Sequence, residues 1–85
     1  QTEMIRFVKP PQEIVKVGNQ TFLNFPVNIV KVECLIKSAL HADWNANTSF
    51  VIPTIEFGGI SCKWYFMSQQ ERDEEFNSLL KRFDL

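Results

Sequence analysis

The residues best equipped for chemistry are His41, Asp43 and two cysteines, Cys34 and Cys62. An imidazole and a carboxylate two positions apart, beside the indole of Trp44, could act as a general base. General-base catalysis also needs a defined pocket and a group that stabilises developing charge, and no motif here supplies either. We therefore interpret this segment as a solvated loop in which Trp44 packs back over a sheet edge. A small enzyme using His41 and Asp43 is the weakest functional alternative.

A thiol nucleophile would need a polar, partly exposed setting and a nearby base. Cys34 and Cys62 instead lie among valine, isoleucine, tryptophan and phenylalanine, which favours two reduced thiols that act as small hydrophobic residues. The alternative is a disulfide between them, which would stabilise the chain by about 3–4 kcal/mol. Two cysteines and one histidine are too few for a zinc site. We expect no catalytic residue, cofactor or metal, and we identify no small-molecule substrate.

The elements that must position these residues are dominated by the stretch from Phe50 to Met67, where two alternating apolar runs flank Gly58-Gly59. A glycine pair supplies the positive φ angles of a tight hairpin, so we expect a two-residue loop. In that register one face is wholly apolar, pairing Phe57 with Ile60, Ile55 with Cys62, Pro53 with Trp64 and Val51 with Phe66.

The opposite face of this hairpin is polar near its turn, where Glu56 meets Ser61 and Thr54 meets Lys63. At its base it is apolar, because Ile52 meets Tyr65 and Phe50 meets Met67, so something must cover it. Pro53 cannot donate to a ladder, which places the first strand at a sheet edge or marks a bulge.

A second hairpin is predicted from Ile14–Val17 and Thr21–Phe25, which flank Gly18-Asn19-Gln20. It would pair Val15 with Phe22 and Ile14 with Leu23. Ahead of it, residues 1–11 form either an edge strand, at Met4–Val8, or an arm, because Pro10-Pro11 ends any strand there.

The segment Val27–Leu40 fits two patterns. We choose a strand over residues 28–37, with Lys31, Glu33 and Lys37 facing out and Val30, Val32, Cys34 and Ile36 facing in. The alternative is a helix with its stripe at Val32, Leu35, Ile36, Ala39 and Leu40. Ser38–Ser49 shows no sustained period and is predicted to be a long loop.

The C-terminal segment is the clearest helix, expected over residues 68–84. Ser68-Gln69-Gln70-Glu71 is a capping box, and the apolar stripe of Phe76, Leu79, Leu80 and Phe83 has helical spacing. We expect this helix to pack on the sheet.

The 85 residues form a single domain, residues 1–85, because so short a chain sustains one core. No apolar run approaches the length of a membrane span, so we expect a soluble, cytoplasmic protein without membrane contact, with secretion as the alternative. Gln1–Glu3 are interpreted as an addition ahead of a native Met4. Two asparagine motifs, at Asn19 and Asn47, match the glycosylation rule but are read as turn residues.

The fold class predicted from these elements is α+β: an antiparallel β-meander of two hairpins plus a central strand, about five to six strands, with one C-terminal helix packed on the sheet. This order resembles, over residues 12–84, a reduced pleckstrin-homology-like architecture, which closes a curved antiparallel sheet with a helix. The resemblance implies a binding module and carries no site residues across.

The function that fits best is a small non-enzymatic interaction module that presents an apolar sheet face or a sheet edge to a protein partner or to its own copy. Its contact surface is predicted to comprise Trp44, Phe50, Ile52, Tyr65 and Met67, since aromatic residues and methionine are enriched at interface centres. The alternative is a binder of single-stranded nucleic acid through Lys63, Tyr65 and Lys37. The net charge of −1 makes nucleic acid a less favoured partner.

Overall fold

The computed structural model describes residues 5–45 and 48–85, with side chains described for 5–41 and 50–85. Within these described residues, seven strands, one 3₁₀ turn and one helix follow in the order β1 (Phe7–Val8), β2 (Ile14–Val17), β3 (Gln20–Leu23), β4 (Val27–Asn28), η1 (Ile29–Lys31), β5 (Cys34–Asn45), β6 (Thr48–Gly58), β7 (Cys62–Tyr65) and α1 (Gln69–Phe83). All strand pairs are antiparallel. The predicted α+β class, with a C-terminal helix packed on the sheet, is confirmed.

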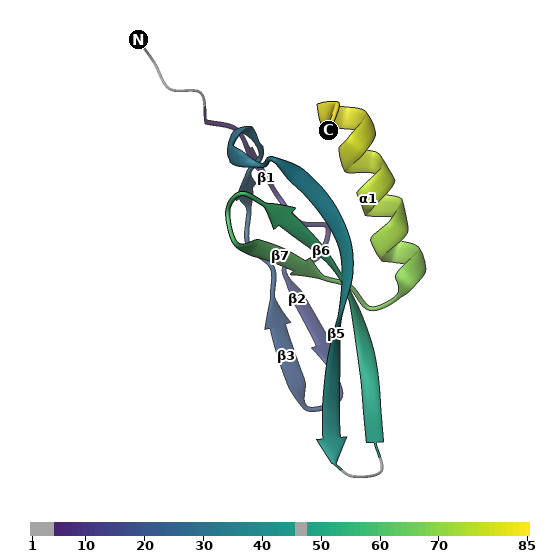
Figure 1. The fold of residues 1–85 in the computed structure, drawn as a ribbon. Coiled ribbons are helices and arrows are strands. Elements are labelled where there is room, and N and C mark those ends of the chain that lie inside the picture. The colour runs from purple at the N-terminus through teal and green to yellow at the C-terminus, as the bar shows by residue number, and fades with distance from the viewer. Residues whose placement is uncertain (1–4, 46–47) are drawn as a thin grey trace.

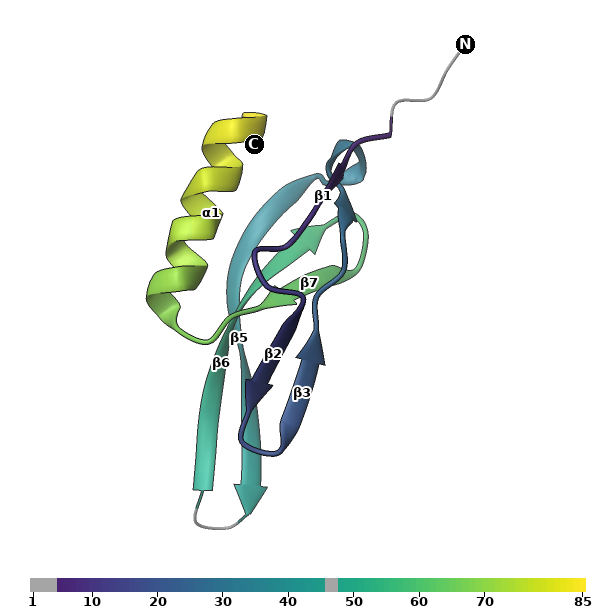
Figure 2. The same cartoon turned by 180° about the vertical axis from the view of Figure 1, so that it is seen from behind.

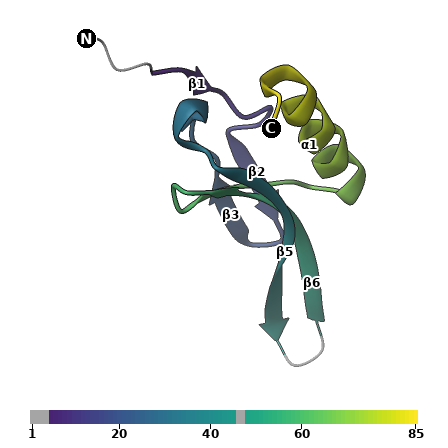
Figure 3. The same cartoon turned by 45° about the horizontal axis from the view of Figure 1, so that its top comes forward.

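The strands form three sheets: β1 pairs with β4, β2 with β3, and β5, β6 and β7 form a meander with β6 in the centre (Figure 1). The helix α1 flanks the β5–β6 ribbon on one side and the β2–β3 hairpin flanks it on the other, in both opposite views (Figures 1 and 2). The far end of the ribbon projects beyond α1 (Figure 3). This projection fits the radius of gyration of 14.1 Å, which exceeds the about 12 Å of a compact chain of this length.

The main core lies between the central sheet and α1. Ile55 and Trp64 are opposite each other in the register and both are fully buried, as is Leu79 of the helix. The rings of Phe57 and Trp64 meet edge to face with their centroids 4.8 Å apart, a favourable aromatic geometry. The N-terminal strands and η1 complete this core with Val8, Val27, Ile29 and Val32.

The second face of the sheet is covered by the chain itself. The ring of Phe22, in β3, lies 4.7 Å from the ring of Tyr65, in β7. Val15, which pairs with Phe22, and Ile52 are each 1% exposed. The β2–β3 hairpin therefore covers this face at Tyr65, whereas Met67, at the base of the main hairpin, is 52% exposed.

Two local predictions are confirmed in detail. The β2–β3 register pairs Ile14 with Leu23 and Val15 with Phe22, as the sequence indicated. Ser68 caps α1: its hydroxyl accepts the N–H of Glu71 at 3.2 Å and donates to the Glu71 carboxylate at 3.1 Å. The Ser68 hydroxyl thus satisfies one free backbone donor at the helix start, and the Glu71 carboxylate bonds that hydroxyl and not the Ser68 N–H.

The predicted register of the main hairpin was wrong by two residues. Phe57 pairs with Cys62 and Ile55 with Trp64, so Gly58–Ser61 form a four-residue connection. Gly58 belongs to the sheet, opposite Cys34, and the positive φ angles fall on Gly59 and Ser61. A shift of two residues leaves every side chain on its predicted face, which is why the apolar face was identified correctly.

The prediction for residues 28–37 was wrong at its start. Ile29–Lys31 form a 3₁₀ turn capped by the Asn28 side chain, and the strand begins at Cys34. The predicted inward face fails at Val30 and Ile36, which are 46% and 45% exposed, but holds at Val32, which is buried. The 3₁₀ turn buries Ile29, and Leu35 packs against the core.

The long loop predicted over Ser38–Ser49 was wrong as well. Apart from residues 46–47, which lie outside the described part, this segment is the far end of β5 and the start of β6. The strands have a register shift between Asp43 and Asn45. Pro53 marks no bulge, because the β5–β6 register runs through it without a shift. It lies just past the β6–β7 pairing, which covers Thr54–Phe57, so at Pro53 the strand β6 becomes an edge strand.

Candidate functional site

The predicted contact residues do not form one exposed surface. Ile52 is 1% exposed and Tyr65 is half-buried against Phe22, so neither is available as an exposed contact surface. Phe50 is half-buried and Met67 is 52% exposed. The side chain of Trp44 lies outside the described residues.

The residues of the nucleic-acid alternative are separated by the sheet. Lys37 is opposite Ile55, on the helix side. Lys63 is opposite Glu56, on the other face. Because neighbouring residues on a strand point to opposite faces, Lys63 and Tyr65 share one face of the sheet and only Lys37 lies on the other.

The described residues show no catalytic arrangement of side chains around His41. His41 is exposed and lies on β5, and the side chain of Asp43 is outside the described residues. Burial raises the pKa of the Cys62 thiol, and a hydrogen bond involving the backbone of Lys63 only partly opposes this. A raised pKa disfavours the nucleophilic thiolate.

Both cysteines are free. Cys34 lies on β5 and Cys62 on β7, with β6 between them. Two interstrand spacings separate their Cα atoms by about 9–10 Å, beyond the span of a disulfide. The sheet therefore excludes the disulfide alternative within one chain.

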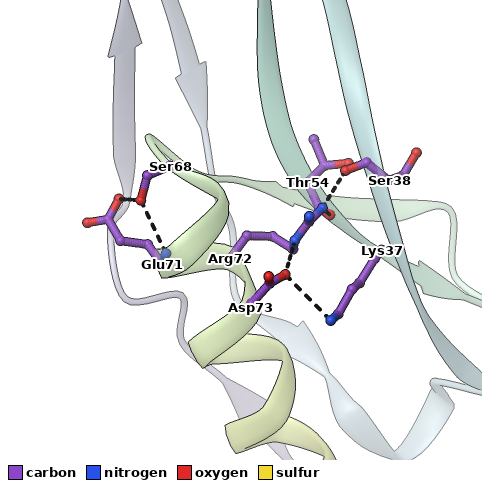
Figure 4. Close-up of polar contacts among 7 residues, drawn as sticks. All are labelled: Lys37, Ser38, Thr54, Ser68, Glu71, Arg72 and Asp73. Carbon is purple, nitrogen blue, oxygen red and sulfur yellow. Dashed lines mark hydrogen bonds and ion pairs between the residues drawn. The ribbon is translucent and has the colours of Figure 1, made fainter.

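The hydrogen bonds of one helix residue, Arg72, show which backbone groups of β5 point towards β6. Arg72, in the first turns of α1 and 8% exposed, donates from Nη1 to the carbonyl oxygens of Ser38 at 2.7 Å and Thr54 at 3.3 Å (Figure 4). Ser38 and Thr54 are directly opposite in the β5–β6 register. One nitrogen reaches both oxygens only if both lie between the two strands, so this is a hydrogen-bonded pair.

The remaining directions follow by alternation along each strand. In β5 the even-numbered residues bond to β6, and the odd-numbered residues direct their N–H and C=O groups outward. In β6 the odd-numbered residues face β7, in agreement with the 2.9 Å bond from the Phe66 N–H to the Pro53 carbonyl. In β7, Tyr65 faces away from β6.

The outer edge of β7 is closed by a side chain. Asn24, 4% exposed, accepts the Tyr65 N–H on Oδ1 at 2.8 Å and donates from Nδ2 to the Tyr65 carbonyl at 3.0 Å. Its carboxamide thus takes the place of a neighbouring strand. The indole N–H of Trp64 donates to the Phe25 carbonyl at 2.8 Å and holds the same segment against β7.

The β6 edge beyond the end of β7 is interrupted by Pro53. This residue faces that edge and has no N–H, so it cannot return the hydrogen bond it receives from Phe66. Proline at such a position discourages further strand pairing. The strands β2 and β3 are four residues each, and short edges also discourage pairing.

The outer edge of β5 has no such protection. Its outward N–H and C=O groups belong to Leu35, Lys37, Ala39, His41 and Asp43. For the first four of these, no hydrogen-bond partner of the outward groups is found among the described residues. We define these five residues as the β5 edge.

The helix contacts β5 through side chains on one face of the sheet. Lys37 Nζ lies 3.5 Å from Asp73 Oδ1 and 4.9 Å from the centre of the Phe76 ring (Figure 4). The Arg72 guanidinium, which donates from Nε to Asp73 Oδ1 at 2.7 Å, lowers the pKa of the Asp73 carboxyl, and Lys37 adds to that effect. These contacts fix the helix over β5 without touching its outward backbone groups.

Two other surface features, a hollow and an apolar patch, do not present a comparable row of outward backbone groups among the described residues. A hollow of about 320 Å³ is lined by Pro11, Gln12, Phe66 and three glutamates, Glu71, Glu74 and Glu75. The outward side of the β2–β3 hairpin and its continuation expose Ile14, Leu23 and Phe25 to 55%, 51% and 60%. Nothing in the described residues shows what would occupy either.

Sequence reasoning missed the β5 edge because it placed residues 38–49 in a loop. The sequence signal for a continuous strand is an alternation that places Ile36, Ser38, Leu40 and Ala42 on one face. This alternation is weak, because two of these residues are small, and it was therefore missed.

Among described residues, no helix is long and apolar enough to cross a membrane, and no cluster of three or more potential metal ligands occurs. Comparison with protein-family models, curated proteins and solved structures found no match.

Proposed function

We propose that this domain is a small interaction module that accepts an extended strand of a partner chain on the β5 edge. The observation that carries the proposal is the contrast between edges: Asn24 closes β7 and Pro53 interrupts β6, while no partner among the described residues bonds the outward groups of β5 from Leu35 to His41. Edge strands left open in this way are templates for pairing with another chain.

Strand addition uses main-chain hydrogen bonds for affinity and side chains for specificity. The β5 edge suits this mode because α1 and the inward bonds to β6 already hold β5 in an extended form, so little conformational entropy is lost when a second strand pairs. The exposed side chains of Ile36 and Lys37 flank the pairing groups and would contact the added strand.

The test is a substitution that removes one outward donor and leaves the ladder to β6 intact. Ala39 is exposed, and its N–H faces outward, so Ala39→Pro deletes only an edge donor. Ala39→Thr keeps the donor and is the matched control. His41→Pro provides a second blocked edge if Ala39→Pro fails to fold, as judged by circular dichroism.

Peptides are selected from a random library against the immobilised chain. Their affinities for the unmodified chain, for Ala39→Thr and for Ala39→Pro are measured by titration. We expect peptides that bind the unmodified chain and Ala39→Thr alike and bind Ala39→Pro at least tenfold more weakly, about 1.4 kcal/mol. The amide protons of residues 35, 37, 39 and 41 should become protected from exchange in the complex. Equal affinities for Ala39→Pro and Ala39→Thr would overturn the proposal.

A further inference from the structure

We propose that the strand accepted by the β5 edge places a glutamate opposite Ala39, and that the carboxylate of this glutamate occupies a hollow beside Arg72. The inference rests on the proposed function and adds the chemistry of the partner, an extended segment with an acidic side chain at a fixed position. It is carried by a buried arginine that is only partly paired and lies on the face where the added side chain would point.

The hollow beside Arg72 lies on the helix side of the β5–β6 ribbon, where α1 begins. It has a volume of about 370 Å³ and is lined by Lys37, Ser38, Ala39, Val51, Pro53, Gln69 and Arg72. We call it the Arg72 hollow. Its lining combines apolar side chains from β5 and β6 with a few polar and cationic groups, a composition that binds and orients ligands with an apolar stem and a polar head. Glutamate has such a side chain.

The guanidinium of Arg72 has one unused donor. Nε donates to Asp73 Oδ1 at 2.7 Å, and Nη1 donates to the carbonyl oxygens of Ser38 and Thr54 (Figure 4). No partner for Nη2 is found among the described residues. Since no fully buried side-chain nitrogen or oxygen of those residues lacks a partner, Nη2 is accessible from the surface, although Arg72 is only 8% exposed. A guanidinium already fixed in place is preorganised to donate to a carboxylate.

The charges around the hollow favour an anion. Lys37 and Arg72 both contact the single carboxylate of Asp73, so one positive charge is left over. Glu71, the acidic residue in the first turn of α1, lines the hollow of about 320 Å³ instead. The helix begins at Gln69, and the positive end of its dipole lies at the same place. An added carboxylate would therefore balance a local excess of positive charge.

The direction of Ala39 determines which residue of the added strand can reach the hollow. Ala39 directs its N–H and C=O groups outward, so one residue of the added strand pairs with it directly. Side chains directly opposite each other lie on the same face, with Cβ atoms about 4.5–5.5 Å apart. Ala39 lies on the helix face, as Lys37 does, and lines the hollow. The side chain opposite Ala39 therefore lies beside the Arg72 hollow, and glutamate reaches one methylene further into it than aspartate.

The first experiment reads the sequences of the peptides selected against the immobilised chain. Their C-termini are amidated, so that every carboxylate belongs to a side chain. We expect glutamate to be enriched at one position, and NMR should show contacts between this residue and the Ala39 methyl group. Glutamine in its place should raise the dissociation constant at least tenfold, because a charge-assisted hydrogen bond is lost. Absence of enrichment, or equal affinities of the glutamate and glutamine peptides, would overturn the inference.

The second experiment places a carboxylate in the Arg72 hollow from the protein itself. Gln69→Glu does this at an exposed position, and an acidic residue at a helix start preserves the helix. We expect the glutamate peptide to bind this variant at least fivefold more weakly than the unmodified chain, and the glutamine peptide to bind both alike.

Gln70→Glu is the matched control, because it adds the same charge at the next exposed residue, which does not line the hollow. It should leave both affinities unchanged. Equal weakening in Gln69→Glu and Gln70→Glu would assign the effect to net charge and overturn the inference.

The results distinguish this inference from the proposed function. If the selected peptides lose affinity for Ala39→Pro but show no preference for glutamate, the strand pairing stands and only the acidic occupant is wrong. If glutamate peptides bind Ala39→Pro and Ala39→Thr equally, the carboxylate is bound without strand pairing, and both the proposed function and this register are wrong.

Discussion

Asn24 contacts Tyr65 as a neighbouring strand would, because one carboxamide bonds both the N–H at 2.8 Å and the C=O at 3.0 Å of the same residue. The two residues are 41 positions apart in the chain. A second Nδ2 bond, at 2.9 Å to the carbonyl of Gln12, ties this side chain to the start of the β2–β3 hairpin. Asn24 therefore links two sheets and closes the edge of β7.

Asn24→Ala is expected to lower the free energy of unfolding by about 2–3 kcal/mol. The reason is that the backbone groups of Tyr65 lose their partner in a buried site, and unsatisfied buried groups cost about 1–3 kcal/mol. Urea unfolding measures the loss, and faster hydrogen exchange at the Tyr65 amide identifies its origin. Asn77→Ala, at an exposed position in α1, is the control and should change stability by less than about 0.5 kcal/mol. An unaltered Tyr65 exchange rate would contradict the explanation.

Arg72→Met is expected to destabilise the fold by about 2 kcal/mol. Methionine keeps the packing of the aliphatic stem but removes the charged hydrogen bonds to Ser38 and Thr54. Both carbonyl oxygens still bond within the β5–β6 ladder, so the loss is smaller than for an orphaned group. Denaturant unfolding of Arg72→Met and of Lys81→Met, an exposed position on the same helix, provides the comparison. Equal losses in the two variants would show that Arg72 does not clamp the helix to the sheet.

Local features were predictable wherever the chemistry lay within a few residues. The capping box of Ser68 and Glu71 and the hairpin turn at Gly18 fix their own geometry, and both predictions were confirmed. Burial then followed from periodicity in α1, where Leu79 is fully buried.

Features that depend on distant segments were not predictable. Position 58 is suited to glycine because a Cβ there would collide with the sulfur of Cys34, a neighbour that only the β5–β6 pairing creates. The role of Asn24 has no sequence signal, since its partner is 41 positions away. The sequence at the far end of β5 and the start of β6 alternates weakly and resembles a loop.

Gly59→Ala should destabilise the fold by about 1–3 kcal/mol. Gly59 has a φ of +98°, and an added Cβ would lie 3.0 Å from the carbonyl oxygen of Lys31, a backbone atom that cannot easily move. Ser61→Gly is the matched variant in the same turn: with a φ of 51° its replacement relieves strain, and we expect no loss of stability. Thermal unfolding of both variants tests the assignment, and a loss in Ser61→Gly equal to that in Gly59→Ala would contradict it.

Glu75→Gln should stabilise the protein at neutral pH and have no effect in acid. Partial burial beside Pro11 and Phe66 raises the pKa of the Glu75 carboxyl, and Arg82 only partly opposes this. The folded state therefore binds the proton more tightly than the unfolded state, so stability falls as pH rises from the ordinary glutamate pKa through the raised value. Glutamine has no charge to bury and removes this loss.

The measurement is urea unfolding at pH 4 and at pH 7. We expect the difference between Glu75→Gln and the unmodified chain to be positive at pH 7 and to vanish at pH 4. Glu74→Gln removes the same charge one residue earlier, at an exposed position, and controls for the change in net charge. The lowered pKa of Asp73 acts with the opposite sign, since its contribution is lost as pH falls below the ordinary aspartate range, and it is common to all three proteins. A gain at pH 7 that is equal in Glu74→Gln and Glu75→Gln would assign the effect to net charge and exclude burial of Glu75 as its cause.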